Sequence, residues 1–501
     1  MSLLQSVENK INAIGLEYIY VICALLFGIT VCILTPPYQV MDEDAHFCRA
    51  WQISAGTVIP SVLSVQEVID GDNPSAKALF NLGLELGKQN GGAGVMTAEL
   101  SERKFFFAQV PKSMVSDHIF NQKISDKGSY YSWEQFGKFL RISGDYGLQE
   151  WFFIHNTGVY TPLSYLPQIT GGFLGKAFSM PLGYTFYCMR IFALLFTIVC
   201  VFFSMRLLPE KKHFLFILAL MPMFLTESAS VSADAVLYGC CILGVSWLIS
   251  MRQKTKQVSW LEYLCLFLFA AVLGLLKPSY GVILLLYFLL PSQCTKSKFA
   301  YYFVGLSLLL VCNIVTTVWV NIVVYQQGTN INFYDIVYPA INIDAQKNFI
   351  MYNPLHFVQA TFNTICAPDA WRMKSFIGVI GNYTLAYDVY FSNWQYGLYA
   401  LLLLIFCIMG KINLTLRQRM AIFSTFIVLT AVIFAIEYVV WTPVGHNMVL
   451  GIQGRYFIPM ALLLSVPLSC NVTYRYENIL AVTGGFFGGA LTVWYTYTAF
   501  Y

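Results

Sequence analysis

Residues 36–53 read PPYQVMDEDAHFCRAWQI and follow directly after the first apolar run of the chain. Three acids, a histidine and an arginine lie within eight residues of this stretch. If a helix begins at Asp42, the side chains of Asp42, His46 and Arg49 share one of its faces. The two prolines restrict the backbone just before the acids. Charges packed this densely beside a membrane boundary cost desolvation, so the stretch is a candidate catalytic motif.

Other interpretations of the same stretch remain open. Asp42 is also a suitable N-cap for the helix that follows, and the acidic triplet is compatible with a solvated loop. Asp42 and Glu43 are equal candidates for a catalytic base. We expect His46 to hydrogen-bond Asp42 and orient it rather than to bind a metal.

The composition determines the broad class of protein. Hydrophobic residues make up 57% of the 501 residues and charged residues 11%, whereas a soluble globular protein has roughly 25% charged residues. Many windows of about 20 residues are almost free of charge, which predicts an all-α polytopic membrane protein. No basic stripe indicates a nucleic-acid partner, and no Cys/His spacing predicts a metal site.

The apolar runs predict a bundle of about eleven transmembrane helices. After a first span near 16–35, the predicted spans are 184–207, 213–228, 231–250, 260–276, 278–291, 299–324, 396–410, 418–440, 455–470 and 479–500. The predicted organisation is a first span in 1–35, a large loop in 36–183, a bundle in 184–324, a second loop in 325–395 and final spans in 396–501.

Lysine and arginine in the short loops predict the orientation in the membrane, because such loops stay in the cytoplasm. By this rule the N-terminus is cytoplasmic and both large loops are periplasmic. Segment 159–178 is apolar but contains Pro162 and Pro167. If it crossed the membrane, the basic loop after Arg206 would face outward, so we expect an interfacial or membrane-embedded helix. The large first loop is expected to carry juxtamembrane helices, with amphipathic pieces near 61–70 and 95–110.

Ionisable residues gather near the outer ends of the predicted spans, at Arg190, Glu227, Asp234, Lys277, Glu437 and Arg455. Ionisable groups within spans are rare and usually face a cavity or each other, so their shared position predicts a polar cavity open to the outer face. Separate ion pairs are the simpler alternative. Asp234 is also a plausible N-cap, and snorkelling explains Lys277 without a substrate.

Such a cavity suits a polyprenyl phosphate-linked sugar, whose charged head lies at the interface while its tail stays in lipid. One carboxylate would accept the proton of the attacking hydroxyl, and cations would stabilise the departing phosphate. We therefore expect a base at Asp42 or Glu43, assisted by His46. The candidate phosphate ligands are Arg455, Lys277, Arg190, Arg372 and Arg49, and further polar residues expected in the cavity are Asp234, Glu227, Tyr280, Gln453 and Tyr456.

The stretch also resembles the signature of a large bacterial family of polytopic membrane proteins catalogued only as a domain of unknown function. In that family a proline pair leads to an Asp-Glu-x-x-His-x-x-Arg run, here Asp42, Glu43, His46 and Arg49. Further matches follow in the order of the family: YTPLSYLPQITGGFLG (160–175), MPMFLTESASVSADA (221–235), LLKPSYGVILLLYFLLP (275–291), SFIGVIG (375–381) and GIQGRYFIPM (451–460).

This family looks like a branch of the GT-C glycosyltransferases, which take sugars from lipid phosphates at the outer face of the membrane. The resemblance implies a GT-C-like bundle, with an acid of the first external loop, Asp42 or Glu43, as the base. The chain departs from the family after SFIGVIG, where it reads NYTLAYD and Asp388 is only a loose equivalent of the usual acid.

The leading hypothesis is an inverting glycosyltransferase of a bacterial inner membrane, with its active site facing the periplasm. Its partners would be a polyprenyl phosphate-linked sugar and a glycan acceptor, for example glucose transfer to the O-antigen of lipopolysaccharide. No cofactor is assigned, and a divalent cation is left open. The alternatives are a transporter or flippase of a lipid-linked saccharide, and an O-antigen polymerase.

Overall fold

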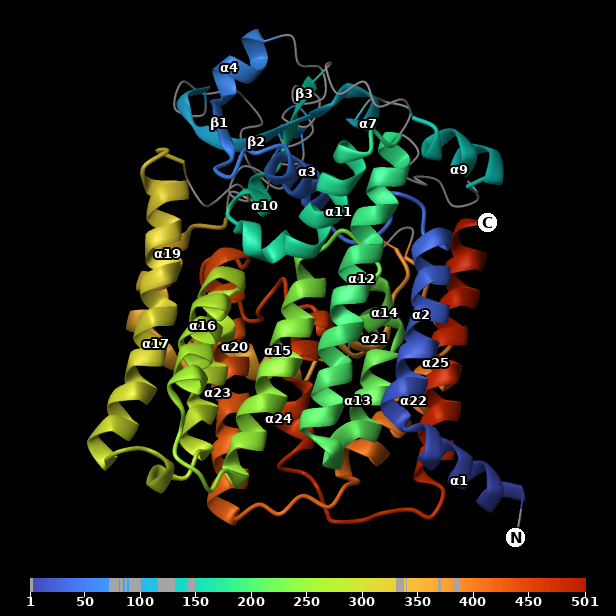
Figure 1. Cartoon of the computed structure of the whole chain (residues 1–501). Helices are drawn as coiled ribbons and strands as arrows, with labels where there is room; N and C mark the ends of the chain where they lie inside the picture. The colour runs from blue at the N-terminus through green and yellow to red at the C-terminus, as the bar shows by residue number, and fades with distance from the viewer. Residues whose placement is uncertain are drawn as a thin grey trace.

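A computed structural model of the chain describes residues 3–71, 101–115, 131–142, 149–329, 340–367, 371–381 and 388–501, with positions 81, 84–85, 88–89 and 338. The described part is mostly helical, and a smaller domain covers one end of a helical bundle (Figure 1). We call this the capped end and define it by α3 (Glu43–Ser54) and α11 (Leu166–Ala177). The N-terminus and the C-terminus lie toward opposite ends of the bundle (Figure 1).

Six of the described helices are long and apolar enough to cross a membrane. They are α2 (Leu16–Leu34), α12 (Leu182–Leu207), α15 (Ala233–Ser250) with η3 (Met251–Gln253), α17 (Lys298–Val320) with η6 (Asn321–Tyr325), α23 (Leu416–Val440) and α25 (Glu477–Phe500). Helix α12 packs against α2, α11 and α15 (Figure 1). The shorter apolar helices are α16 (Trp260–Leu276), η4 (Pro278–Leu289) and α22 (Asn393–Ile408).

Local sequence determines where several of these helices begin. Ser259, Ser392 and Thr415 each precede a helix and form a capping box with the side chain three residues later. Each box satisfies backbone N–H groups that a helix leaves unpaired at its start. Segment η4 is a 3₁₀-helix of 12 residues. Its rise of about 2 Å per residue makes it about 24 Å long, which is longer than an α-helix of the same number of residues.

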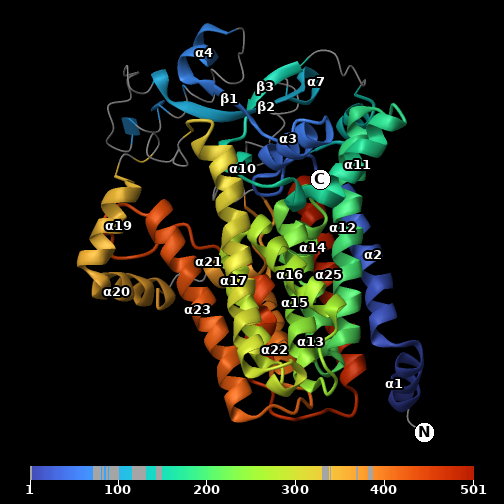
Figure 2. The ribbon, with the colours of Figure 1, turned by 60° about the vertical axis from the view of Figure 1, so that its left-hand side comes forward.

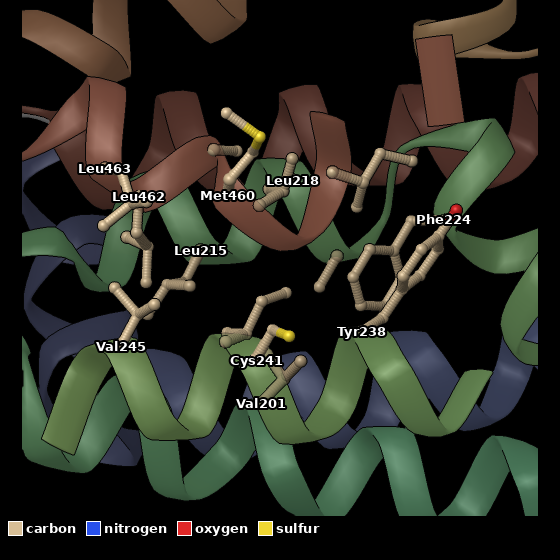
Figure 3. Packing of buried hydrophobic residues seen from close by; sticks show 14 of the residues in the cluster. Val201, Leu215, Leu218, Phe224, Tyr238, Cys241, Val245, Met460, Leu462 and Leu463 are labelled. Carbon is tan, nitrogen blue, oxygen red and sulfur yellow. The ribbon is translucent and has the colours of Figure 1, made fainter. Parts of the chain in front are cut away.

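Two predicted spans are broken in the structure. Segment 213–228 divides into α13 (Lys212–Ala219) and α14 (Pro222–Ser228), because Pro222 stands in the first turn of a new helix. Segment 455–470 divides into η7 (Gly454–Met460) and α24 (Ala461–Ser465). Both broken segments are mostly buried, and Figure 3 shows side chains of α13, α15 and α24 packed against one another, among them Leu215, Leu218, Val245, Leu462 and Leu463.

The prediction of an all-α fold is wrong for the first large loop, which contains a three-stranded antiparallel sheet. Strand β2 (Lys104–Pro111) lies between β1 (Ser61–Ser64) and β3 (Gln149–Phe153), with Val62 opposite Phe106. Both faces of β2 are buried. Phe105 and Phe107 pack against α4 (Val65–Asp70), and Phe106 and alternate residues pack with α3. Burial on two faces favours an extended strand in this part of the segment that was expected to be amphipathic.

Short helices complete the two loops. Helix α11 has 12 residues, fewer than the roughly 20 needed to cross a bilayer. Helices α19 (Ile343–Tyr352) and α20 (Pro354–Ile365) stand beside α23, outside the main bundle (Figure 2). The other short elements are α7 (Lys112–Val115), α9 (Trp133–Leu140), α10 (His155–Gly158), η1 (Pro162–Tyr165), η2 (Pro209–Lys211), η5 (Ser292–Cys294) and α21 (Trp371–Ile377).

An amphipathic helix that the sequence analysis did not predict, α1 (Leu3–Ile14), precedes the first span. Its Glu8 carboxylate accepts hydrogen bonds from the backbone N–H groups of Asn478 and Ile479. These amides belong to the first turn of α25, so Glu8 caps that helix from a distant part of the chain. Apolar residues at helical spacing (Leu3, Leu4, Val7, Ile11 and Ile14) were the signal for this helix.

We predict that Gly171→Ala destabilises the packing of α11 on α12. A Cβ atom at position 171 would lie 2.8 Å from the backbone N and Cα of Met189, so the cost should be about 1–3 kcal/mol. Gly137→Ala is the matched control, because a Cβ atom at helical position 137 meets no atom within 4 Å. Thermal unfolding in detergent measures both variants, and equal stability of the two would contradict the prediction.

Candidate functional site

A fully buried ion pair joins Glu43 to Arg190 at the capped end. Both oxygens of Glu43 accept from the guanidinium, at 2.8 Å from Nε and 2.6 Å from Nη2. Arg190 also donates to the carbonyls of Cys32, Thr35 and Pro36. The pair therefore connects α12 to the end of α2 and to the start of α3.

Two backbone N–H groups donate further hydrogen bonds to the Glu43 carboxylate. The N–H groups of Tyr38 and Val231 each lie 3.0 Å from a Glu43 oxygen. A fully buried carboxylate whose oxygens already accept this many hydrogen bonds has no access to a substrate hydroxyl. We therefore no longer consider Glu43 as a base or Arg190 as a phosphate ligand, and we assign both to structure.

Asp42, the neighbour of Glu43, has different surroundings. It occupies the N-cap position of α3 in the left-handed region, at φ 56°, and its side chain makes no capping hydrogen bond. Its Oδ1 accepts from Nδ2 of Asn156 at 3.3 Å, and its Oδ2 lies 3.6 Å from Nη2 of Arg455. The side chain is 37% exposed. Aspartate tolerates this backbone conformation better than most residues, and such strained positions are frequent at functional sites.

Arg455 is the centre of a cluster of acids contributed by separate helices. Its Nη1 lies 3.0 Å from Glu227 at the end of α14 and 3.2 Å from Asp234 at the start of α15. Its Nε donates to Oε1 of Gln453 at 2.7 Å. Asp234 is not the N-cap of α15, because Ser232 caps that helix and accepts from the N–H group of residue 234. The Asp234 carboxylate is thus available to Arg455.

The backbone around Arg455 is held by three other elements. The hydroxyl of Tyr238 donates to the Arg455 carbonyl, and the hydroxyl of Tyr280 donates to the Tyr456 carbonyl at 2.7 Å. Ser375 of α21 accepts from the N–H group of Gly454. A Cβ atom at Gly454 would overlap the carbonyl of Arg372. The sequence analysis predicted Tyr280 as a polar residue of the cavity and Arg372 as a phosphate ligand. In the structure, Tyr280 and the backbone of Arg372 contact and support η7.

Lys277 supplies a second cation close to Arg455. Its Nζ lies 4.7 Å from the centroid of the Tyr456 ring, and Cζ of Arg455 lies 5.8 Å from the same centroid. Glu437 at the end of α23 lies near this pair, and its Oε2 is buried without a hydrogen-bond partner in the described structure. The structure thus brings together Asp42, Glu227, Asp234, Lys277, Glu437 and Arg455.

His46 does not hydrogen-bond the Asp42 side chain as predicted. Its Nδ1 lies 2.6 Å from the hydroxyl of Tyr165, a residue that the sequence analysis did not identify. Burial lowers the pKa of His46 to about 4, and the nearby charges of Asp234 and Arg455 act in opposite directions. The imidazole is therefore neutral at physiological pH and serves as a hydrogen-bonding group.

Arg49 is likewise committed to structure. Its guanidinium donates to Oε1 of Gln52 and to the carbonyls of Val58 and Tyr160. Because α3 begins at Glu43, with Asp42 in a left-handed conformation, the predicted shared face of Asp42, His46 and Arg49 does not form one site. We no longer include Arg49 among the phosphate ligands.

The cluster combines one accessible carboxylate with two neighbouring cations. Such an arrangement can accept a proton at Asp42 and bind an anion at Arg455 and Lys277. Within the described ranges, no group of three or more His, Cys, Asp or Glu side chains is arranged to hold a metal ion.

We predict that the two adjacent acids respond differently to mutation. Arg190→Met leaves Glu43 as an unpaired buried charge, which should cost about 3–5 kcal/mol and lower the yield of folded protein. Asp42→Asn removes a partly exposed charge and should change stability by less than about 1 kcal/mol. Thermal unfolding and size-exclusion chromatography measure both variants. A stable Arg190→Met variant would contradict the structural assignment.

We also predict that His46 makes stability sensitive to acid. Its folded pKa of about 4 lies below its ordinary value of 6.5, so the contribution is present above about pH 6.5 and is lost as the pH falls toward 4. Between about pH 7 and pH 5 the wild type should lose about 2 kcal/mol that His46→Gln does not lose. Thermal unfolding of both proteins at the two pH values measures the difference, and parallel losses would refute it.

The chain matches one known family over most of its length. The sequence pattern of the family described as "Predicted membrane protein (DUF2142)" matches residues 25–464. Searches of curated proteins and of solved structures found no match. The match includes α14, α15, η7 and the Asp42 segment, so the charge cluster lies within the part shared with the family. The chain belongs to this family of predicted membrane proteins, DUF2142.

Proposed function

We propose that this protein is an inverting glycosyltransferase that takes a sugar from a polyprenyl phosphate-linked donor. The observation that carries the proposal is the Asp42 carboxylate, partly exposed and 3.6 Å from Arg455, with Lys277 close to the same arginine. A base beside paired cations is what this reaction requires. The resemblance of the sequence motifs to GT-C glycosyltransferases supports the same reaction.

We infer that the chain crosses the bacterial inner membrane eleven times. The six long helices would account for six crossings, and α13–α14, α16, η4, α22 and η7–α24 for the other five. Basic loops between these elements would face the cytoplasm, which orients the capped end toward the periplasm. In this arrangement α11 lies in the outer interface and the lipid tail of the donor remains in the bilayer.

The proposed reaction is a single displacement at the anomeric carbon. The acceptor hydroxyl forms the new C–O bond while its proton moves to Asp42. The bond between the anomeric carbon and the phosphate oxygen breaks, and its electron pair remains on that oxygen. Arg455 and Lys277 stabilise the negative charge that develops there. The phosphate leaves as an anion, so no general acid is needed.

The acceptor of the proposal is an envelope glycan, and glucose transfer to O-antigen is the specific case that we put to the test. A divalent cation is not needed by this mechanism. A flippase for the same lipid would move it without breaking the sugar–phosphate bond, and a polymerase would extend lipid-linked O-antigen. The reaction products therefore distinguish the three functions.

We predict that Asp42→Asn lowers kcat for sugar transfer about 10²–10⁴-fold, because the variant cannot accept the proton. Asp44→Asn is the matched control, since Asp44 belongs to the same acidic run but makes no described ion pair with Arg455. The assay follows radiolabelled glucose from polyprenyl phosphate-glucose to O-antigen with purified protein in nanodiscs. Wild-type transfer by Asp42→Asn would overturn the assignment of the base. Movement of the intact donor across vesicles without transfer would instead support a flippase.

A further inference from the structure

Arg455 is shared by three carboxylates, and this sharing bears on how it can bind a phosphate. Glu227 and Asp234 both lie against Nη1, at 3.0 and 3.2 Å, and Asp42 lies 3.6 Å from Nη2. The N–H group on Nε donates to Gln453. A phosphate that binds the Nη1 edge of this guanidinium must therefore compete with Glu227 and Asp234.

Of the three acids that contact Arg455, Glu227 has the fewest other groups that could stabilise its charge. Its side chain is 2% exposed, and its Oε1 accepts from Nη1 of Arg455. Its Oε2 is buried and has no hydrogen-bond partner in the part of the chain that the structure describes. If a phosphate displaced Glu227 from Nη1 of Arg455, both oxygens of Glu227 would be buried without a hydrogen-bond donor. A carboxylate in that situation is strongly favoured to bind a proton.

The other two acids that contact Arg455 have further partners. Asp42 is 37% exposed and accepts from Asn156. Asp234 lies close to Lys277 and His46 as well as to Arg455. Glu437 also has a buried Oε2 without a hydrogen-bond partner in the described residues. It interacts with Lys277 more strongly than with Arg455, and no described ion pair joins it to Arg455. The charged groups that surround Glu227 itself are Arg455, Asp234 and Asp42.

We propose that Glu227 takes up one proton from water when a phosphodiester binds Arg455. The neutral acid then remains beside the bound anion, and the negative charge of the ligand replaces the charge that Glu227 gives up. Glu227 is a positioning residue in this scheme, since it acts through Arg455. The proposal rests on the proposed function for the identity of the ligand, a lipid-linked sugar phosphodiester, but it concerns binding and not transfer.

The test measures binding and proton uptake together. The probe is polyprenyl phosphate-glucose without acceptor, because a phosphodiester keeps one fixed negative charge between about pH 6 and pH 9. The full chain is placed in phosphatidylcholine nanodiscs and titrated by calorimetry in two buffers of different ionisation enthalpy. Dimethyl phosphate is the second probe and shows whether the same site takes a free phosphodiester.

For the wild type we expect about one proton bound per donor at high pH, and an affinity that falls about tenfold per pH unit there. Glu227→Gln should bind the donor without proton uptake and without this pH dependence. Glu437→Gln removes another acid that has a buried oxygen, but not a described ion-pair partner of Arg455, so it is the matched control and should keep both. Asp234→Asn should also keep proton uptake while binding more tightly, which provides a second variant if Glu227→Gln does not fold.

Binding without proton uptake by the wild type would overturn the proposal, and so would loss of uptake in Glu437→Gln but not in Glu227→Gln. Equal affinity of the wild type and Arg455→Ala for both probes would overturn it as well, because the phosphate would then not bind at Arg455. Proton-coupled donor binding without any sugar transfer would support this inference while refuting the proposed function. The two proposals can therefore fail separately.

Discussion

The ion pair between Glu43 and Arg190 is the interaction on which the capped end depends. Two opposite charges are removed completely from water, which is favourable only when each finds many hydrogen bonds. Here the guanidinium reaches three carbonyls at the end of α2, and the carboxylate reaches two backbone N–H groups. One of these belongs to Val231, just before α15. The pair thus holds α2, α3, α12 and the start of α15 in one arrangement.

The position of Asp42 follows from that arrangement. Because Glu43 is anchored, α3 begins there, and Asp42 takes the left-handed conformation that ends the preceding turn. Its carboxylate makes no capping hydrogen bond with α3 and lies beside Arg455. Two neighbouring acids in the sequence therefore have opposite environments, one buried and saturated with donors and the other partly exposed. The two carboxylates therefore differ in solvation, which is one of the factors that decide the chemistry of a carboxylate.

Broken helices place the rest of the cluster. Helix α14 ends at Ser228, so Glu227 lies at a helix end, and η7 begins at Gly454, immediately before Arg455. Unbroken helices would carry their backbone through this region with all hydrogen bonds satisfied inside the helix. The breaks instead bring a carboxylate and a guanidinium together in an apolar bundle, where their interaction is stronger than in water. The breaks thus gather charges of both signs at one place in the bundle.

The sequence by itself determined the membrane class, most helix positions and the residues from which the cluster is drawn, because apolar length and rare charges are local properties. It did not determine which charges pair. Arg190 and Arg455 look equivalent along the chain, yet one is bound by Glu43 and the other by Glu227 and Asp234. Only the tertiary structure decides this, since each partner comes from a distant helix. The β2 strand was missed for the same reason: its two buried faces depend on α3 and α4 packing against it from opposite sides.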